Sequence, residues 1–340
     1  MRHPPPTPQR SHRVLAATAL AALLYAWLLK YLSDRTLYYL MDARGWESHR
    51  RDMCTELRQR YFFGDLRPDS PDQTRPLELS CRQAIAVPAR QCWVHNPRGQ
   101  RLNVLRYGSA AADAPLLVYL PGASANYLAG TRYIPMARRL GFELVIMELS
   151  NHGSSDSDGR GTAYGCREKD DVTALLAALA RTDPGRPILL FGSSMSAMAV
   201  VNAAPALNQF ADLRAIVLES APSSLPGMIK AIARKLRLPA WLASQVTRVV
   251  ELRTGYRYTE AALLPLAAQL RRPTWVTIAA GDVLVPLEMA REIYAALPPG
   301  LPHRLSIFAH GDHSAVWNGQ PEQFEAELAA FWQSALLQRS

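Results

Sequence analysis

The stretch ILLFGSSMSAMAVV, residues 188–201, joins an apolar strand pattern to an apolar helical pattern through a turn of small residues. Such a turn is typical of a nucleophile elbow, where a sharp strand-to-helix turn lifts a serine hydroxyl clear of a sheet. The residues two before and two after that serine must be small, because backbone comes close on both sides. Ser194 meets this condition, with Gly192 before it and Ser196 after it. We therefore predict that Ser194 is a nucleophile; the competing interpretation is a small-residue turn inside a packed core.

Strand patterns and helical patterns alternate along most of the chain. Continuous apolar strands separated by helices are typical of a mostly parallel sheet with helices on both faces. The sequence predicts a hairpin over 92–108, strands at 115–120, 143–149, 187–191, 215–220, 274–280 and 304–308, and helices at 131–140, 168–181, 287–297 and 321–336. Ligands of such sheets bind outside the carboxyl ends of the strands, so we expect the chemistry in the turns that follow them.

Two of these turns offer an acid and a base. Asp282 follows the strand at 274–280, where it can either orient a histidine or cap a turn. His310 and His313 follow the strand at 304–308. A base is needed because a neutral serine hydroxyl is a poor nucleophile.

A third turn, PGASAN at 121–126, follows the strand at 115–120. Its Gly122 lets the chain turn closely, and the backbone N–H of Ala123 can then point at an oxyanion. The N–H of Met195, one residue past Ser194, would be the second donor. An ordinary Pro-Gly turn is the alternative interpretation of this stretch.

The chain order Ser194, Asp282, His313 is that of the α/β-hydrolase arrangement. From about residue 92 to 337 the chain resembles the α/β-hydrolase superfamily, in particular its lysophospholipase-like esterases and serine-peptidase-like hydrolases. The segments that carry the resemblance are VYLPGASANY, ELSNHGSSDSDG, ILLFGSSMSAM, GDVLVP and HGDHS.

The resemblance implies the α/β-hydrolase fold, with Ser194 as nucleophile, Asp282 as acid and His313 as base. It favours His313 over His310, because the histidine of this family usually follows a glycine-containing turn. It also implies oxyanion N–H groups from Ala123 and Met195, and a site lined by residues 150–157. Two positions depart from the family pattern: Pro121 stands where many members have histidine, and Ser196 replaces the usual second glycine.

These residues predict a serine hydrolase that cleaves carboxylic esters through an acyl-enzyme, without a metal or organic cofactor. An apolar anchor and an amphipathic insertion favour lipid or other apolar acyl substrates. An acyltransferase, a thioesterase or an amidase or peptidase would use the same triad. A protein of a different class, a non-catalytic membrane-tethered binding protein, would share the fold, since fold does not imply function.

The amino end carries an apolar run. Residues 1–13 are Pro-rich and basic and are expected to be disordered, whereas 14–29 contain no charge. We predict a transmembrane anchor at 14–32, because no small-residue cleavage site follows the run as a signal peptide would require. Basic residues stand on both sides of the run, so the positive-inside rule does not orient it. We expect a bacterial inner-membrane protein whose catalytic domain is exported to the periplasm.

The rest of the chain divides by composition. A helical connector and linker is expected at 33–75 and the hydrolase domain at 76–340. Within that domain, residues 222–270 interrupt the alternation with a basic amphipathic stretch, which we predict to be a lid-like insertion over the site.

Charge and cysteine content bound the partners. The chain of 340 residues has a net charge of +9, but no basic run with interleaved aromatics marks a nucleic-acid surface. We expect no nucleic-acid partner. None of the four cysteines (Cys54, Cys81, Cys92, Cys166) lies in a CxxC pair. A Cys81–Cys92 disulfide and free, buried thiols are both open, and the oligomeric state is not indicated.

Overall fold

One eight-stranded sheet organises the computed structural model, which describes residues 8–37, 54, 56–64, 78–109, 111–258 and 263–338. The strand order is β1-β2-β4-β3-β5-β6-β7-β8. The strands are β1 (Arg90–His95), β2 (Arg101–Tyr107), β3 (Leu116–Leu120), β4 (Glu143–Met147), β5 (Ile188–Ser193), β6 (Leu213–Glu219), β7 (Thr274–Ala279) and β8 (Arg304–Phe308). β1 and β2 form the predicted hairpin, β2 pairs antiparallel with β4, and all later pairs are parallel. The mostly parallel sheet is confirmed.

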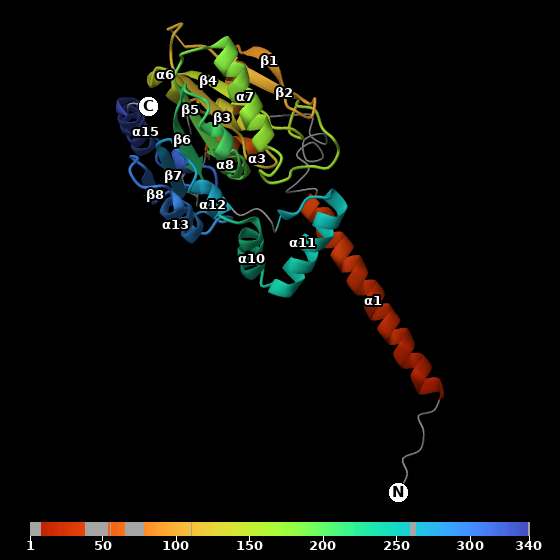
Figure 1. Cartoon of the computed structure of the whole chain (residues 1–340). Helices are drawn as coiled ribbons and strands as arrows, with labels where there is room; N and C mark the ends of the chain where they lie inside the picture. The colour runs from red at the N-terminus through yellow and green to blue at the C-terminus, as the bar shows by residue number, and fades with distance from the viewer. Residues whose placement is uncertain are drawn as a thin grey trace.

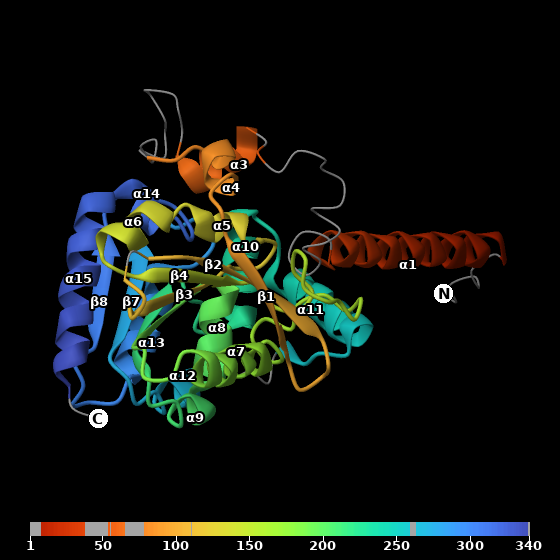
Figure 2. The ribbon, with the colours of Figure 1, turned by 90° about the horizontal axis from the view of Figure 1, so that it is seen from above.

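Helices cover both faces of this sheet (Figures 1 and 2). One face carries α7 (Lys169–Thr182), α8 (Met195–Asn202), α9 (Ala204–Leu207), α12 (Leu263–Ala267) and α13 (Leu287–Ala296). The other carries α5 (Leu128–Thr131), α6 (Ile134–Arg139), α14 (Val316–Gly319) and α15 (Pro321–Leu337).

The residues of β3 show why the strand sequence is continuously apolar. Val118 and Leu120 pack with the first helical layer, whereas Leu117 and Tyr119 pack with the second. Successive side chains of a strand point to opposite faces. A strand that is covered on both faces therefore needs apolar side chains at every position, which is the pattern seen in the sequence.

A single long helix, α1 (Pro8–Thr36), extends away from the sheet domain (Figure 1). Among the described residues it is the helix that is long and apolar enough to cross a membrane, over His12–Thr36, and its apolar window is not buried. A membrane anchor and a signal sequence both meet this test. The expectation of disorder over 1–13 is wrong from residue 8 onward, because Pro8 is tolerated in the first turn and nothing after it breaks the helix. Residues 1–7 lie outside the described residues.

Two short helices precede the sheet, α3 (Glu56–Phe63) and α4 (Cys81–Ile85), and they lie over α5 (Figure 2). Of the expected connector at 33–75, the structure describes only the end of α1, Cys54 and the residues around α3. A disulfide joins Cys54 to Cys81, so the Cys81–Cys92 pairing is wrong. Cys81 opens α4 beneath α3, whereas Cys92 is a free thiol in the middle of β1.

The predicted insertion after β6 forms two helices, α10 (Leu225–Lys235) and α11 (Ala240–Thr254). They project beyond the sheet domain and lie beside the carboxyl end of α1 (Figure 1). α12 does not belong with them, because it packs with α8 and α13 in the helical layer. The segment that stands out from the fold is therefore shorter than the expected 222–270.

Candidate active site

Ser194 sits at the turn between β5 and α8 with φ 55° and ψ −119°, a conformation that non-glycine residues rarely adopt. Gly192 makes this turn possible. A Cβ at position 192 would lie 2.9 Å from the backbone N and Cα of Ala197, which is closer than real Cβ contacts. The turn therefore has the strained, close-packed geometry of a nucleophile elbow.

The two departures from the family pattern contact each other. The Ser196 hydroxyl donates a hydrogen bond to the carbonyl oxygen of Pro121. Ser196 is completely buried, so its hydroxyl needs this acceptor. The serine at 196 thus links the elbow to the turn after β3, and neither departure displaces Ser194.

Ser194, His313 and Asp282 form one chain of hydrogen bonds. The distance from Ser194 Oγ to His313 Nε2 is 2.8 Å. His313 Nδ1 lies 3.0 Å from Asp282 Oδ2 and 3.1 Å from Oδ1. The three residues follow β5, β8 and β7, whose carboxyl ends meet at one edge of the sheet. The structure brings together the three side chains that the sequence analysis singled out.

Asp282 has the environment of an ionised carboxylate. Its Oδ1 also accepts hydrogen bonds from the N–H groups of Leu284 (2.9 Å) and Val285 (2.8 Å). Burial raises the pKa of Asp282, but His313 and these two N–H groups outweigh burial and hold the pKa below its ordinary value. A negative charge therefore faces His313 Nδ1 and favours the tautomer that carries its proton there.

His310 takes no part in this arrangement. It is exposed, and its backbone N–H donates to the Gln320 side chain. His313 is buried, and its own backbone N–H donates to Asp312 Oδ1 at 2.6 Å. The turn between the two histidines thus points only the second one at Ser194.

The two predicted oxyanion donors belong to residues that lie near Ser194. Met195 is the first residue of α8, and Ala123 follows β3 and lines the same cavity as Ser194. Within the part of the chain that the structure describes, no protein acceptor takes a hydrogen bond from either N–H. Both groups are thus free to donate to a bound oxygen, as the helix amino end at Met195 favours.

Glu219 is a functional neighbour that the sequence analysis missed. This buried residue ends β6. Its carboxylate accepts hydrogen bonds from the Ser193 hydroxyl at 2.8 Å and from the N–H of Val316 at 3.2 Å. Burial raises the pKa of its carboxyl, and Arg132, the Ser193 hydroxyl and Val316 oppose that rise. Glu219 therefore joins β5, the strand that leads into the elbow, to α14, the helix that follows the His313 loop. Its position at a strand end was the one available signal in the sequence.

Arg132 was also missed. It is buried at the end of α5, and it donates to the carbonyl of Ser314 at 2.5 Å and to Asn318 Oδ1 at 2.9 Å. Ser314 follows His313 in its loop, and Asn318 lies in α14, the short helix that comes next. Asn318 in turn donates to the carbonyl of Phe62 at 3.0 Å. This chain connects α3 to the loop that holds the histidine.

The connector helix α3 forms one wall of the site. Tyr61 donates its hydroxyl to the carbonyl oxygen of His313 at 2.8 Å. A cavity of about 290 Å³ reaches Ser194 and His313. α3 forms one of its walls, and the turn after β3 forms another. Its lining includes Tyr61, Phe62, Tyr119, Ala123, Ala125, Ala129 and Arg132. No feature of the sequence indicated that residues so far before the sheet would lie there.

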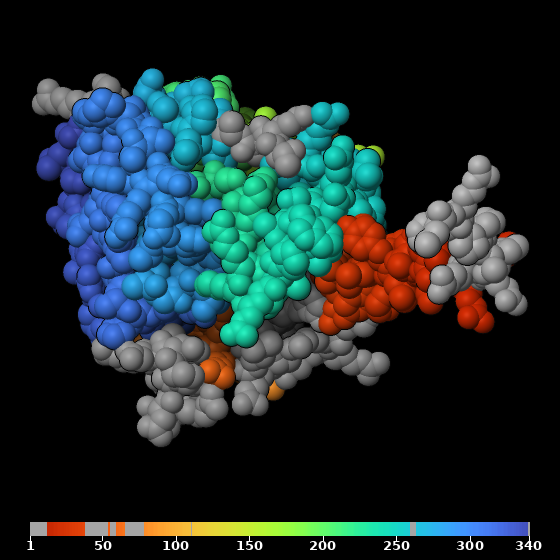
Figure 3. Space-filling view, turned by 90° about the horizontal axis from the view of Figure 1, so that it is seen from below, coloured from red at the N-terminus to blue at the C-terminus, as the bar shows by residue number. Residues whose placement is uncertain are grey.

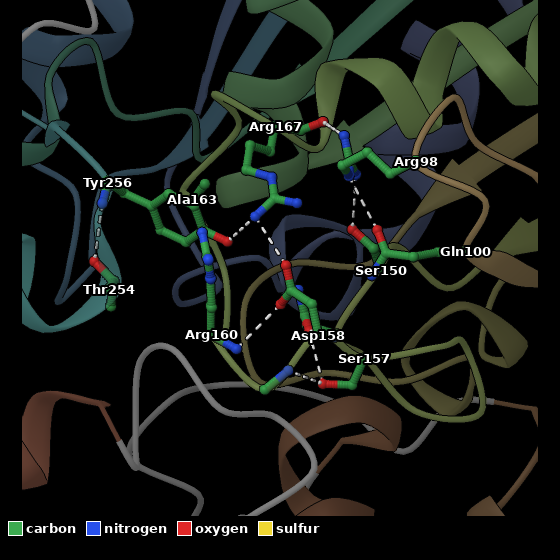
Figure 4. A network of polar contacts seen from close by, with 12 residues as sticks. Arg98, Gln100, Ser150, Ser157, Asp158, Arg160, Ala163, Arg167, Thr254 and Tyr256 are labelled. Carbon is green, nitrogen blue, oxygen red and sulfur yellow. Dashed lines mark hydrogen bonds and ion pairs between the residues drawn. The ribbon is translucent and has the colours of Figure 1, made fainter.

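The segment after β4 has a different place from the one the resemblance implied. None of residues 150–157 is among the described residues that line this cavity. Polar contacts hold the segment instead, as Figure 4 shows. Within the segment, Ser150 Oγ accepts from Arg98 at 3.3 Å. Just after it, Asp158 Oδ2 accepts from Arg167 at 2.8 Å, and Arg167 also donates to the Tyr256 hydroxyl. This network joins the segment to the residues that follow α11.

The fold and the elbow define a class of protein, the α/β-hydrolases. Residues 117–328, more than half of the chain, match the description "Alpha/beta hydrolase family", and the chain belongs to that family.

Individual relatives are distant. The chain is 24% identical over 241 residues to the uncharacterized protein YqkD of Bacillus subtilis (strain 168). The matched region covers 69% of this chain and 77% of YqkD. It is similar in structure to the Pyrococcus furiosus esterase Pf2001, with a TM-score of 0.58, 20% identity, and coverage of 76% of this chain and 95% of the esterase. A putative aryl esterase from Burkholderia cenocepacia has a TM-score of 0.54, 17% identity, and coverage of 73% and 100%. At these identities the likeness to the solved structures concerns the fold.

Proposed function

We propose that this protein is a serine hydrolase that cleaves carboxylic esters through an acyl-enzyme. The observation that carries the proposal is the continuous chain of contacts from Ser194 Oγ through His313 to Asp282, at 2.8 and 3.0 Å. These are the distances at which a base can take the proton of a nucleophile and an acid can orient the base.

Acylation would begin at Ser194. Its Oγ attacks the acyl carbonyl carbon while His313 Nε2 takes the hydroxyl proton, and Asp282 stabilises the charge that forms on the imidazole. The N–H groups of Ala123 and Met195 would hold the negative oxygen of the tetrahedral intermediate. The same proton on His313 then passes to the leaving alkoxide, which departs as the alcohol.

Deacylation would repeat these steps with water. Water gives a proton to His313 Nε2 and attacks the acyl carbon, and the proton returns to Ser194 Oγ when the acid is released. The residues that stabilise the first intermediate serve the second as well. No other side chain is needed for either half of the cycle.

The cavity supports apolar acyl groups of modest size. Most of its lining is aromatic or small and apolar, and its volume of about 290 Å³ is at the lower end of the range for ligand pockets. The apolar helix α1 favours substrates that are found at a membrane, such as lipids. We therefore propose esters of short and medium acyl chains as the substrates to test first.

Active-site labelling tests the proposal. Wild-type protein, Ser194→Ala and Ser193→Ala are incubated with a fluorophosphonate, and the adduct is located by mass spectrometry of peptides. We expect an adduct on Ser194 in the wild type and in Ser193→Ala, and none in Ser194→Ala. The control is matched because Ser193 is the adjacent serine and its hydroxyl faces Glu219.

The negative result has a clear meaning. If folded wild-type protein carries no adduct, in detergent and in lipid alike, Ser194 is not activated and the non-catalytic interpretation replaces this proposal. If the adduct forms, product analysis with a competing alcohol separates ester hydrolysis from acyl transfer. Ester, thioester and amide substrates of one acyl chain then separate an esterase from a thioesterase or an amidase.

A further inference from the structure

The turn between α10 and α11 exposes large apolar side chains next to one another. Leu236 is 64% exposed, Leu238 38% and Trp241 58%. These residues follow the last turn of α10 and open α11, so they lie together at the tip of the helical pair. Scattered apolar residues on a surface are ordinary, but exposed apolar side chains that lie next to one another are typical of a binding surface.

The same tip is strongly basic. Residues 221–250 contain five Lys or Arg residues and no Asp or Glu. Arg234 and Arg237 are exposed, and within the part of the chain that the structure describes neither forms an ion pair. Lys235, between them, donates to the carbonyl of Val283. A partner of this surface should therefore combine an apolar layer with negative charge.

The tip is continuous with α1. Arg253 of α11 binds Asp34 of α1 at 2.6 Å and Ser33 at 2.9 Å, and the rings of Trp241 and Tyr25 lie 6.1 Å apart. Figure 3 shows α10, α11 and α1 side by side on one face of the molecule. Trp241 thus lies against the stretch of α1 whose side chains, such as Trp27 at 63%, are left exposed.

An apolar groove opens on this face. It has a volume of about 260 Å³ and lies between the carboxyl end of α1, α10 and α11. Leu32, Leu236 and Leu238 are among its lining residues. The groove shares no lining residue with the cavity at Ser194, so it is not part of the candidate active site.

We propose that residues 234–241, the docking tip, bind the surface of the anionic bilayer that α1 enters. Leu236, Leu238 and Trp241 enter the interfacial layer, where tryptophan and leucine side chains are favoured. Arg234 and Arg237 bind the phosphates of anionic lipids. A bilayer is the partner that supplies the apolar layer, the negative charge and the continuity with α1 together. The proposal rests on α1 remaining in the membrane, and it does not depend on the esterase proposal.

Tryptophan fluorescence of the full chain in lipid nanodiscs tests this docking. The discs contain phosphatidylcholine brominated near its glycerol end, mixed equimolar with phosphatidylglycerol. We expect Trp241→Phe to remove part of the emission that the brominated lipid quenches. Trp93→Phe is the matched control, since Trp93 is also exposed but lies on β1, and it should leave the quenched emission unchanged.

Charge is tested in the same discs. The double variant Arg234→Gln/Arg237→Gln should lower the quenching of Trp241 about twofold with phosphatidylglycerol present, and should have no effect in discs of phosphatidylcholine alone. Quenching of Trp241 that is independent of both anionic lipid and the two arginines would overturn the proposed phosphate contacts.

Two further results would overturn the docking itself. If Trp241→Phe leaves the quenched emission unchanged, the tip does not reach the bilayer. If Trp241 is shielded from aqueous acrylamide but not quenched by brominated lipid, a protein covers the tip instead. Trp27→Phe shows whether α1 itself is in the bilayer, because the substitution removes quenched emission only in that case. It therefore distinguishes a tip that does not dock from a helix α1 that is not inserted.

Discussion

The three serines of the elbow have three different hydrogen-bond partners, because the path of the backbone points each hydroxyl in a different direction. Ser193 donates to Glu219, Ser196 donates to Pro121, and Ser194 faces His313. Ser193 ends a strand and Ser196 lies in the first turn of a helix, so both side chains point into the protein. Of the three, Ser194 is the residue with positive φ, and its hydroxyl faces His313. The local chain path therefore selects the nucleophile among chemically identical side chains.

At this scale we predict that the two histidines of the HGDHS turn differ in their effect on activity. His313→Ala removes the base and should lower kcat/KM roughly 10³-fold or more toward an ester that wild type cleaves. His310→Ala should leave kcat/KM unchanged, because His310 is exposed and its side chain has no part in the site. Steady-state hydrolysis of a p-nitrophenyl ester measures both. Equal losses in the two variants would contradict the assignment of the base.

At the scale of elements, the two edges of the sheet have different roles. The carboxyl edge holds Ser194, Asp282 and His313, whereas the amino edge holds a buried ion-pair network. Arg106 of β2 binds Glu143 at 2.6 Å and Asp183 at 2.7 Å. Arg186, just before β5, binds the same two carboxylates, each at 2.8 Å. These contacts join β2, β4 and the turns around β5 far from the chemistry, so they should act on stability.

We therefore predict that Asp183→Asn destabilises the fold by about 3 kcal/mol at neutral pH, because it leaves Arg106 and Arg186 with Glu143 as their one remaining carboxylate partner in this network. Hydrogen bonds from Arg106 hold the pKa of Asp183 well below its ordinary value of 3.8. A depressed pKa gives a contribution that is present above 3.8 and is lost as pH falls further toward the folded-state pKa.

Urea unfolding across pH measures this effect. The difference in unfolding free energy between wild type and Asp183→Asn should shrink as pH falls below about 4. Asp113→Asn, at an exposed carboxylate, is the control and should change stability little at any pH. A difference for Asp183→Asn that stays constant into acid would contradict the role given to the ion pairs.

The second prediction at this scale concerns α3. The Cys54–Cys81 disulfide ties the segment that carries Tyr61 and Phe62 to α4, so Cys54→Ser should loosen one wall of the cavity. We expect a loss of stability of about 3 kcal/mol, the typical value for such a cross-link, and a rise in KM for the ester.

Thermal unfolding and steady-state kinetics test this expectation. Cys92→Ser/Cys166→Ser is the control, because both residues are free thiols, and it should leave KM unchanged. A Cys54→Ser protein with wild-type Tm and KM would show that α3 holds its place without the cross-link.

At the scale of the whole molecule, the fate of α1 determines where the hydrolase domain is found. A retained helix keeps the domain at a membrane, whereas a cleaved signal sequence releases it. A disulfide such as Cys54–Cys81 is typical of proteins in oxidising compartments, and export to the periplasm stays a prediction.

We predict that α1 is retained. The intact mass of the protein extracted from membranes should then include residues 12–36, and detergent rather than alkaline carbonate should be needed to release it. An intact mass that begins after residue 36, in a fraction soluble without detergent, would contradict the anchor.

The sequence analysis was most successful where local pattern and backbone geometry agree. The mostly parallel sheet, the hairpin and the elbow at Ser194 follow from strand periodicity and small residues, which need no knowledge of distant contacts. The choice of His313 over His310 depended on family resemblance, and the turn geometry now gives it a physical basis. The role of these residues in catalysis stays a prediction until the labelling is done.

What the sequence determined by itself is the set of strand-end turns and the chemical groups that each one carries, because apolar periodicity and small residues act through neighbours in the chain. Only the tertiary structure decided the pairing of Cys54 with Cys81, the wall that Tyr61 and Phe62 form, and the buried contacts of Arg132 and Glu219. Each of these features depends on two segments that are far apart in the sequence and that packing brings together. Spacing along the chain does not indicate which distant segments will be in contact.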